Sequence, residues 1–153
     1  MVGDRQGEAM MFRLQMFFLK LFAPFHTFVF RLTGGRLMGK FGLPVLLLTT
    51  TGARTGRQQT SPLLYIEHEG TLLLPASLWG GPRNPAWYHN CIANPEVVVE
   101  TRGMRRTMRA EIAPEEDRQR LYDLFKAGSG HYAGHEARTT RKIPVVILRE
   151  LDG

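Results

Sequence analysis

The chain has 153 residues, 43% of them hydrophobic, which suits one domain built around a single core. Its one cysteine, Cys91, excludes an internal disulfide and a four-cysteine metal site, and such sparse cysteine usage fits a reducing cytoplasm. The net charge of +6 comes mainly from residues 9–66, where seven Lys and Arg side chains stand without any Asp or Glu. This excess favours an anionic membrane or an anionic cofactor as partner over a nucleic acid.

The first predicted element is the apolar block of residues 10–31, which contains seven of the nine phenylalanines. On a helical wheel its basic residues, Arg13 and Lys20 among them, form one narrow stripe, and the rest is almost entirely apolar. Lys20 and Pro24 interrupt the run of about 20 apolar residues that a membrane span needs, and no signal-peptide cleavage site follows. We therefore expect an N-terminal helix in residues 1–31. It either packs on the folded domain or a second subunit, or lies peripherally on the cytoplasmic face of a membrane.

Residues 32–153 alternate short apolar runs with turn residues, and they predict one α+β domain with a small barrel of about six mostly antiparallel strands. Strands are expected at residues 44–50, 61–67, 71–76, 96–101, 104–112 and 143–149. One helix is expected from Asn84, as its N-cap, to about Ala93, and another from Pro114 to about Lys126. The glycine-rich stretch of residues 128–140, GSGHYAGHEARTT, predicts a loop.

A basic glycine turn follows the first strand in the segment TTTGARTGR, residues 49–57. Arg54, Thr55, Gly56 and Arg57 present guanidinium, hydroxyl and backbone N–H donors together, a combination that suits a phosphate. The turn lacks the Gly-Lys-Ser/Thr ending of a nucleotide P-loop, so ATP and GTP are not indicated. A solvated basic turn between two strands is the alternative that the residues alone leave open.

A second loop begins where the strand at residues 71–76 ends, at Ala76, Ser77 and Leu78. Its backbone amides and the Ser77 hydroxyl could hydrogen-bond the edge of a flat heteroaromatic ring, although a plain strand end is the alternative. Because only one hairpin separates this loop from the basic turn, both could flank a single elongated ligand.

Other candidate site residues lie on the predicted short helix and in the predicted loop. Trp87, Tyr88 and Asn90 project from different faces of that helix, so they cannot all bury against one ligand, and Trp87 either packs in the core or beside a ligand. Only His131 and His135 have the i,i+4 spacing of paired metal ligands, and because glycines interrupt that stretch we expect no metal site.

Five segments together resemble the deazaflavin-dependent nitroreductase and quinone reductase family, whose members use coenzyme F420. They are TTTGARTGR, SPLLY, PAS before a Gly-Gly loop, NPAWYHNCIANP, and RTTRKIPVVIL. The resemblance runs from about Leu32 to Leu148, and its most specific part is the string N-P-x-W-Y-x-N. It implies a split β-barrel related to the flavin-binding barrels, with hydride transfer at the deazaflavin ring.

The same resemblance implies how the cofactor is held. The turn at Arg54, Thr55, Gly56 and Arg57 would bind the phosphate and glutamyl tail, and relatives commonly carry arginine where this chain has Ala53 and Gln59. Further cofactor-binding positions are implied at Gln59, Thr60, Ser61, Pro62, Leu63, Ala76, Ser77, Leu78, Trp87, Tyr88 and Asn90. In the family the glycine-rich loop covers the ring and supplies tyrosines that face the substrate.

Tyr132 matches one of these substrate-facing tyrosines, whereas Ser129 and His135 occupy positions where relatives can carry others. Tyr132 and His135, assisted by Ser77, are therefore the candidates for polarising a substrate carbonyl or nitro oxygen.

The expected function is an F420-dependent oxidoreductase that passes a hydride to a quinone, such as menaquinone, or to a nitroaromatic acceptor. F420 is favoured over FMN because the basic turn suits a polyanionic tail. The alternative is a split-barrel protein that binds or carries F420 or a flavin without turnover. The sequence leaves self-association open and gives no sign of a nucleic-acid partner.

Overall fold

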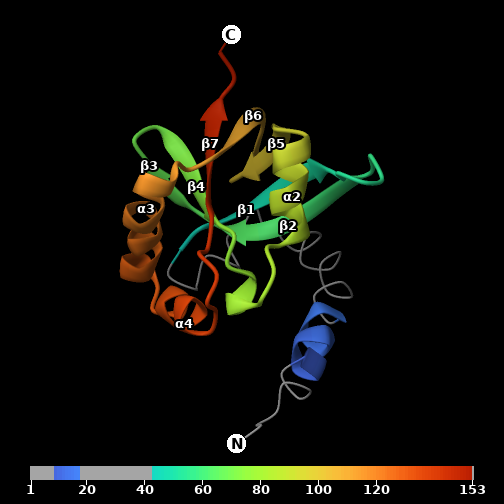
Figure 1. Ribbon diagram of the computed structural model, residues 1–153. Helices are drawn as coiled ribbons and strands as arrows, with labels where there is room; N and C mark the ends of the chain where they lie inside the picture. The colour runs from blue at the N-terminus through green and yellow to red at the C-terminus, as the bar shows by residue number, and fades with distance from the viewer. Residues whose placement is uncertain (1–8, 18–42, 153) are drawn as a thin grey trace, which may run out of the picture.

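The computed structural model describes residues 9–17 and 43–152. Within them, seven antiparallel strands form one sheet in the order β2-β1-β5-β6-β7-β4-β3 (Figure 1). The strands are β1 (Val45–Thr51), β2 (Gln58–Leu64), β3 (Ile66–His68), β4 (Thr71–Pro75), β5 (Glu96–Thr101), β6 (Met104–Ile112) and β7 (Val145–Glu150). The helical elements of residues 43–152 are the 3₁₀ turn η2 (Leu78–Gly80), α2 (Ala86–Ala93), α3 (Glu115–Gly128) and α4 (His131–Ala137). The predicted α+β class is confirmed.

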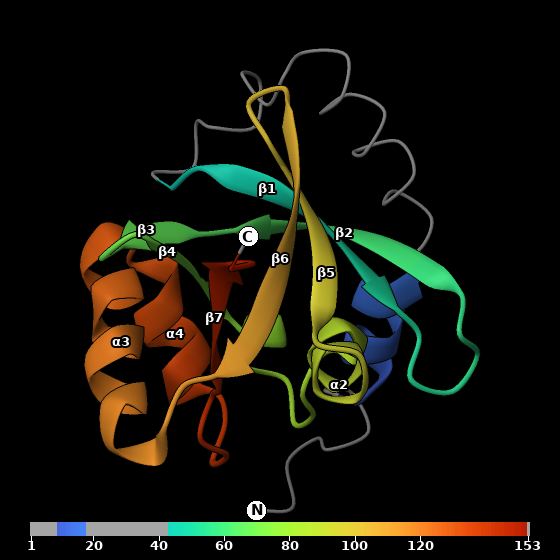
Figure 2. The ribbon, with the colours of Figure 1, turned by 90° about the horizontal axis from the view of Figure 1, so that it is seen from above.

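The sheet curls because its two edge strands, β2 and β3, are neighbours in the chain (Figure 2). Tyr65 separates them, and its N–H donates to the carbonyl of Pro44 at 3.0 Å. Leu64 pairs with Val45 in β1, whereas Ile66 pairs with Leu73 in β4. The single strand predicted at residues 61–67 is therefore wrong: the chain changes partners at Tyr65, which gives seven strands rather than six.

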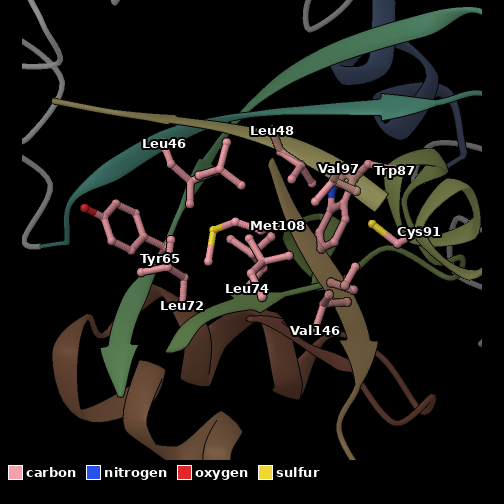
Figure 3. Close-up of a cluster of buried hydrophobic side chains, with 14 residues drawn as sticks. Leu46, Leu48, Tyr65, Leu72, Leu74, Trp87, Cys91, Val97, Met108 and Val146 are labelled. Carbon is pink, nitrogen blue, oxygen red and sulfur yellow. The ribbon is translucent and has the colours of Figure 1, made fainter. Parts of the chain in front are cut away.

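Two hydrophobic clusters lie on opposite faces of the sheet, and successive residues of one strand contribute to each. In β7, Val146 and Leu148 belong to the cluster that includes Trp87 and Cys91 of α2 (Figure 3). Val145 and Ile147 belong to the cluster covered by α3 and α4. Alternation along a strand places neighbouring side chains on opposite faces. Burial on both faces explains why the strand reads as a continuous apolar run.

The structure confirms the predicted helix α3 and corrects two other helical predictions. Asn84 does not cap α2, which begins at Ala86 with Pro85 in the cap position and no side-chain cap bond. Residues 131–137, predicted as part of a loop, form the helix α4. Glycine disfavours a helix by about 1 kcal/mol relative to alanine, but here the burial of Tyr132 in the second core cluster outweighs that local preference.

Residues 9–17 are helical and carry exposed apolar side chains, among them Met10, Met11 and Leu14. The rest of the predicted 10–31 helix, and the predicted boundary between residues 31 and 32, lie outside the described residues. Among the helices that the structure does describe, none has the length and apolar character needed to cross a membrane.

Candidate functional site

The basic turn joins β1 to β2 and is held closed by its own backbone. The N–H of Gly52 donates to Arg57 O at 2.7 Å, and the N–H of Gly56 donates to Gly52 O at 2.9 Å. Gly56 has φ 66°, a conformation that residues with a Cβ rarely adopt, which accounts for glycine at this position. The Thr55 hydroxyl accepts from the N–H of Arg57 at 3.2 Å.

The donors that the turn does not use internally belong to Arg54, Thr55 and Arg57. All three residues are exposed. Within residues 9–17 and 43–152, the Arg54 and Arg57 guanidinium groups make no hydrogen bond or ion pair, and the Arg54 and Thr55 amides meet no protein acceptor. Guanidinium and backbone N–H groups without protein partners are the donors that a phosphate-like anion requires.

Asn90 of α2 holds this turn in place through side-chain hydrogen bonds. Its side-chain oxygen accepts from the N–H of Ala53 at 2.9 Å, and its Nδ2 donates to Thr50 Oγ1 at 3.1 Å and to Gln59 Oε1 at 3.3 Å. Asn90 is only 5% exposed, so the protein itself uses its polar atoms. The predicted cofactor contact is therefore better described as support. By fixing the oxygen of Gln59, Asn90 leaves the Gln59 amide hydrogens available to an anion.

The predicted contacts on the strand after the turn lie along β2, the edge of the sheet beside β1. Gln59 is exposed, and the remaining predicted positions are half-buried: Thr60, Ser61, Pro62 and Leu63. Thr60 Oγ1 lies 2.8 Å from Thr49 Oγ1, and the Leu63 side chain packs against the first core cluster. In Figure 1 the glycine turn lies at the start of β2, where the chain leaves β1.

The second loop, residues 76–84, has a strained backbone. Leu78, Trp79 and Gly80 have φ values of 42°, 54° and 76°. Left-handed conformations are uncommon for leucine and tryptophan and persist where surrounding contacts hold them. Within the described residues the N–H groups of Ser77 and Leu78 have no acceptor, although Ser77 is buried. These two amides are therefore donors without a protein acceptor in the described part of the chain, and they could bind a ligand.

Helix α4 packs directly on this loop. A Cβ at Gly80 would lie 2.3 Å from the carbonyl oxygen of His135, so the approach requires glycine there. The side chains also meet, because His135 Nδ1 lies 3.1 Å from Ser77 Oγ. Two of the predicted catalytic residues, 58 positions apart, are thereby brought together.

Burial keeps the His135 imidazole neutral at neutral pH. Desolvation lowers its pKa below the ordinary value of 6.5, and the positive charges of Arg138 and His131 lower it further. A neutral imidazole at Nδ1 can accept from the serine hydroxyl or donate to it, depending on the tautomer. Ser77 and His135 thus form a hydrogen-bonded pair that can pass a proton.

Tyr132, the third predicted catalytic residue, lies in the second core cluster and is 5% exposed. Its ring packs edge-on against Phe125, Tyr122 and His135. Burial, with a smaller contribution from Tyr122, raises its pKa well above the ordinary value of 10.0. In this position the ring supports α4 and the imidazole of His135.

The side chain of Trp87 also points into the core. Trp87 is 8% exposed and points into the first core cluster beside Cys91 and Val97 (Figure 3). Tyr88 is half-buried and packs edge-on against His89. Burial raises the pKa of Cys91 to about 12, so its thiol is unreactive at neutral pH. Of the two roles predicted for Trp87, the structure gives it core packing.

The prediction that glycines prevent His131 and His135 from sharing a helix was wrong, because both lie in α4. His135, however, is hydrogen-bonded to Ser77. In the part of the chain that the structure describes, no group of three or more His, Cys, Asp or Glu side chains could hold a metal ion.

Two further features at the second loop were not foreseen from the sequence. The ring of Phe12, in the helix of residues 9–17, lies against Gly81, where a Cβ would come within 2.6 Å of it. Arg141, which follows α4, donates hydrogen bonds to several oxygens of the loop. No spacing pattern could have indicated this, because about 60 residues separate the partners.

Residues 25–150 match the family of F420H(2)-dependent quinone reductases. The chain belongs to this family. An F420H(2)-dependent quinone reductase of Mycobacterium tuberculosis is 37% identical over 128 residues, covering 80% of this chain and 86% of the relative. The chain is therefore an F420-dependent oxidoreductase with coenzyme F420 as its cofactor.

Solved structures show the same fold. An F420-H2-dependent reductase, FDR-A, superimposes with a TM-score of 0.63 at 34% identity, covering 69% of this chain and 94% of that one. A structure described as a domain-swapped dimer matches with a TM-score of 0.63 at 30% identity over 80% of this chain and 98% of its own. The haem storage protein HutZ of Vibrio cholerae shares the fold at 13% identity, with a TM-score of 0.53. The predicted split barrel is confirmed.

The residues present fit F420. An anionic tail requires exposed, unpaired cationic and N–H donors, and the turn of residues 52–57 provides them at one end of β2. A flat ring with polar edges requires directed donors, and the unpartnered amides of Ser77 and Leu78 provide them in the second loop. Both halves of the site therefore have donors that the protein itself leaves unused.

Proposed function

We propose that this F420-dependent oxidoreductase reduces a quinone beside the hydrogen-bonded pair Ser77 and His135. The observation that carries the proposal is the 3.1 Å contact between Ser77 Oγ and His135 Nδ1, which joins the loop with free amides to the helix that packs on it. Reduced F420, when bound, supplies the hydride.

Arg54, Arg57 and the amides of Arg54 and Thr55 would hold the phosphate and tail of the cofactor. The exposed amide of Gln59, oriented by Asn90, would add a donor along β2. The N–H groups of Ser77 and Leu78 would bond the polar edge of the ring. With these assignments, the affinity for F420 would have two parts: charged contacts to the tail, which salt weakens, and amide hydrogen bonds to the ring.

A quinone takes up one hydride and one proton to become a quinol, and the chain's own groups can manage the proton. As negative charge develops on the quinone oxygen, the Ser77 hydroxyl would donate to it, backed by the imidazole of His135. The lowered pKa keeps the imidazole neutral, so in the tautomer with its proton on Nδ1 it would pass that proton to Ser77 as the hydroxyl gives its own to the quinone oxygen, while Nε2 takes up a proton from solvent. Tyr132 packs on His135 and keeps its ring in place.

We further propose menaquinone as the acceptor, reached from the cytoplasmic face of a membrane. The exposed Met10, Met11 and Leu14 support this proposal because they form an apolar surface on the helix whose Phe12 touches the second loop. Such a surface, with Arg13 beside it, suits interfacial contact with anionic lipid. Nitroaromatic compounds would serve as artificial acceptors at the same place.

Steady-state oxidation of reduced F420 by a short-chain menaquinone tests the proposal directly. We expect turnover with F420 and none with FMN, and a loss of about a hundredfold in kcat for Ser77→Ala, the usual cost of removing one donor to a developing oxyanion. F420 affinity, measured by fluorescence, is the internal control and should change far less than kcat. Tight F420 binding without turnover by any quinone would instead make the protein a carrier.

A further inference from the structure

Arg141 is the residue that ties the second loop together. Its Nε donates to Gly81 O at 2.9 Å, and its Nη2 donates to Ser77 O at 2.9 Å and to Ala76 O at 3.2 Å. Its Nη1 donates to the side-chain oxygen of Asn84 at 2.5 Å. One half-buried guanidinium thus spans the whole loop, from the end of β4 to the start of α2. The planar fork of arginine allows this, whereas a lysine ammonium offers only a single point of attachment.

The segment between these contacts is the strained one. Arg141 binds Ala76 and Ser77 just before the left-handed residues and Gly81 just after them, and Leu78 and Trp79 lie between. Strained backbone persists only when its surroundings over-determine it. The guanidinium therefore fixes a loop shape that the local sequence alone would not keep.

The bonds of Arg141 also fall on the peptide groups that carry the free donors. The carbonyl of Ala76 shares a peptide unit with the N–H of Ser77, and the carbonyl of Ser77 shares one with the N–H of Leu78. A cation bound at a carbonyl polarises its peptide unit and strengthens the N–H of that unit as a donor. Both amides lack a protein acceptor among the described residues.

The charge of Arg141 has no carboxylate partner in the part of the chain that the structure describes. All four of its acceptors are neutral oxygens, and burial lowers its pKa. Other arginines of the fold, such as Arg149 with Glu111, do pair with acids. An arginine remains protonated in proteins, so a positive charge stays behind the ring end of the site.

We infer that Arg141 is a positioning residue for the deazaflavin ring. It holds the Ala76–Leu78 peptides in their strained conformation and polarises the Ser77 and Leu78 amides toward the ring edge. This inference rests on the proposed placement of the ring at this loop. It assigns Arg141 to ring recognition and leaves tail recognition to Arg54 and Arg57.

The test compares full F420 with the deazaflavin riboside that lacks the phosphate and tail, both titrated by fluorescence without any acceptor. Arg141→Gln should weaken binding of the two ligands by the same factor, about tenfold or more, as expected for lost charged hydrogen bonds. It should also raise the mobility of the bound ring, seen as lower fluorescence anisotropy at saturation. The salt dependence of F420 binding should stay unchanged, because the tail site is intact.

Arg118→Gln is the matched control. Arg118 also donates to a backbone carbonyl, that of Ile143 at 3.1 Å, but it makes no bond to the second loop. It should leave riboside affinity and anisotropy at wild-type values even if it lowers the thermal unfolding midpoint. Arg141→Lys keeps the charge without the fork and should restore only part of the affinity. It also serves as the test variant should Arg141→Gln fail to fold.

The inference is overturned if Arg141→Gln or Arg141→Lys binds the riboside with wild-type affinity and anisotropy, or if affinity falls equally in Arg118→Gln. Because no quinone is present, these outcomes are separate from the proposed function. Absence of quinone turnover in the wild-type protein would overturn the proposed function and leave the binding result standing.

Discussion

At the scale of single residues, the site is made of groups whose bonding the fold leaves incomplete. Arg54 and Arg57 are exposed without partners among the described residues, and the amides of Ser77 and Leu78 lack acceptors there. Asn90 and Arg141, by contrast, spend their polar atoms inside the protein and orient the groups that remain free. The candidate ligand contacts are thus polar groups without a protein partner, whereas the supporting residues have their polar atoms hydrogen-bonded within the protein.

The first residue-scale prediction concerns the two arginines of the basic turn. Arg54→Ala and Arg57→Ala should each weaken F420 binding by about 1.5–3 kcal/mol, the range for a hydrogen bond to a charged group. Rising salt should weaken wild-type binding and have less effect on the double variant, because the screened interaction has been removed. Titration at two ionic strengths measures both effects.

Arg105→Ala is the control for this experiment, since it removes an exposed arginine from β6, away from the turn. It changes the net charge by the same amount and should leave affinity unchanged. If the Arg54→Ala, Arg57→Ala double variant binds F420 as tightly as the wild type, the tail lies elsewhere.

The second residue-scale prediction concerns the pH dependence of His135. Its pKa is lowered, so the imidazole is mostly neutral across pH 6.5–8, and kcat should change less there than it would with an unperturbed histidine, which is half protonated at pH 6.5. Activity should fall mainly below pH 6.5, as the ring gains a proton and its bond to Ser77 changes. His135→Gln should lose that acid limb, while His131→Gln, on the same helix, should keep it. A wild-type kcat that falls by about half between pH 8 and 6.5, as with an unperturbed histidine, would contradict the assignment.

The same shift has a consequence for stability, with a defined sign. Between the lowered folded pKa and the ordinary value of 6.5, the unfolded state binds the proton and the folded state does not. The His135 contribution to the free energy of unfolding is therefore complete above 6.5 and is lost as pH falls through the folded pKa. Urea unfolding at several pH values should show a smaller acid-side decline in His135→Gln than in the wild type.

At the scale of elements, the site depends on how three segments meet at the second loop. Helix α4 presents His135 to Ser77, the segment after α4 presents Arg141, and the helix of residues 9–17 places Phe12 on Gly81. None of the three is adjacent to the loop in sequence. Their packing shapes the loop at which we propose that the ring binds.

The element-scale prediction concerns the helix of residues 9–17. Replacing Met10, Met11 and Leu14 together by serine should reduce sedimentation with anionic vesicles and leave F420 affinity unchanged, because these side chains are exposed. Raised salt should also weaken vesicle binding, since a basic residue near a lipid surface, such as Arg13, contributes about 1 kcal/mol. Ile92→Ser, which removes an exposed apolar side chain of α2, is the control.

Deletion of residues 1–31 extends that experiment to the whole predicted segment. A folded, F420-binding remainder that no longer sediments with vesicles would support membrane contact. Aggregation or loss of folding on deletion would show instead that the segment packs on the domain or on a second copy of the chain.

At the scale of the whole molecule, one curled sheet lies between two hydrophobic clusters and contributes side chains to both. Leu148 lies in the cluster with α2, and Ile147, the next residue back, lies in the cluster with α3 and α4. Because both clusters share strands β4 and β7, neither can be lost while the sheet stays intact. The basic turn and the second loop are therefore held by a single structural unit.

The whole-molecule prediction follows from that shared sheet. Leu148→Ala, at a fully buried position, should lower the free energy of unfolding by about 2–5 kcal/mol, the usual cost of emptying a leucine site. Unfolding in urea should remain a single transition by both tryptophan fluorescence and circular dichroism, since the clusters unfold together. Two separated transitions would contradict this description.

The sequence by itself determined the features that depend on neighbours along the chain. The glycine turn at residues 52–57, the hairpin of β5 and β6, and α3 follow from turn residues, apolar runs and acidic residues in a first helical turn. The family string around Trp87 identified F420 as the cofactor because it preserves residue types at fixed spacing. These predictions needed no knowledge of which distant segments meet.

Only the tertiary structure decided the features that depend on distant contacts. The chain divides β2 from β3 at Tyr65 because each half finds a different partner strand. Residues 131–137 become helical because Tyr132 is buried against α3. The Asn84 side chain accepts a hydrogen bond from Arg141, 57 positions away, and does not cap α2. The Asn90 side chain accepts from the N–H of Ala53, 37 positions away. Such contacts follow no local periodicity, because their free energy arises only once the sheet has brought their partners together.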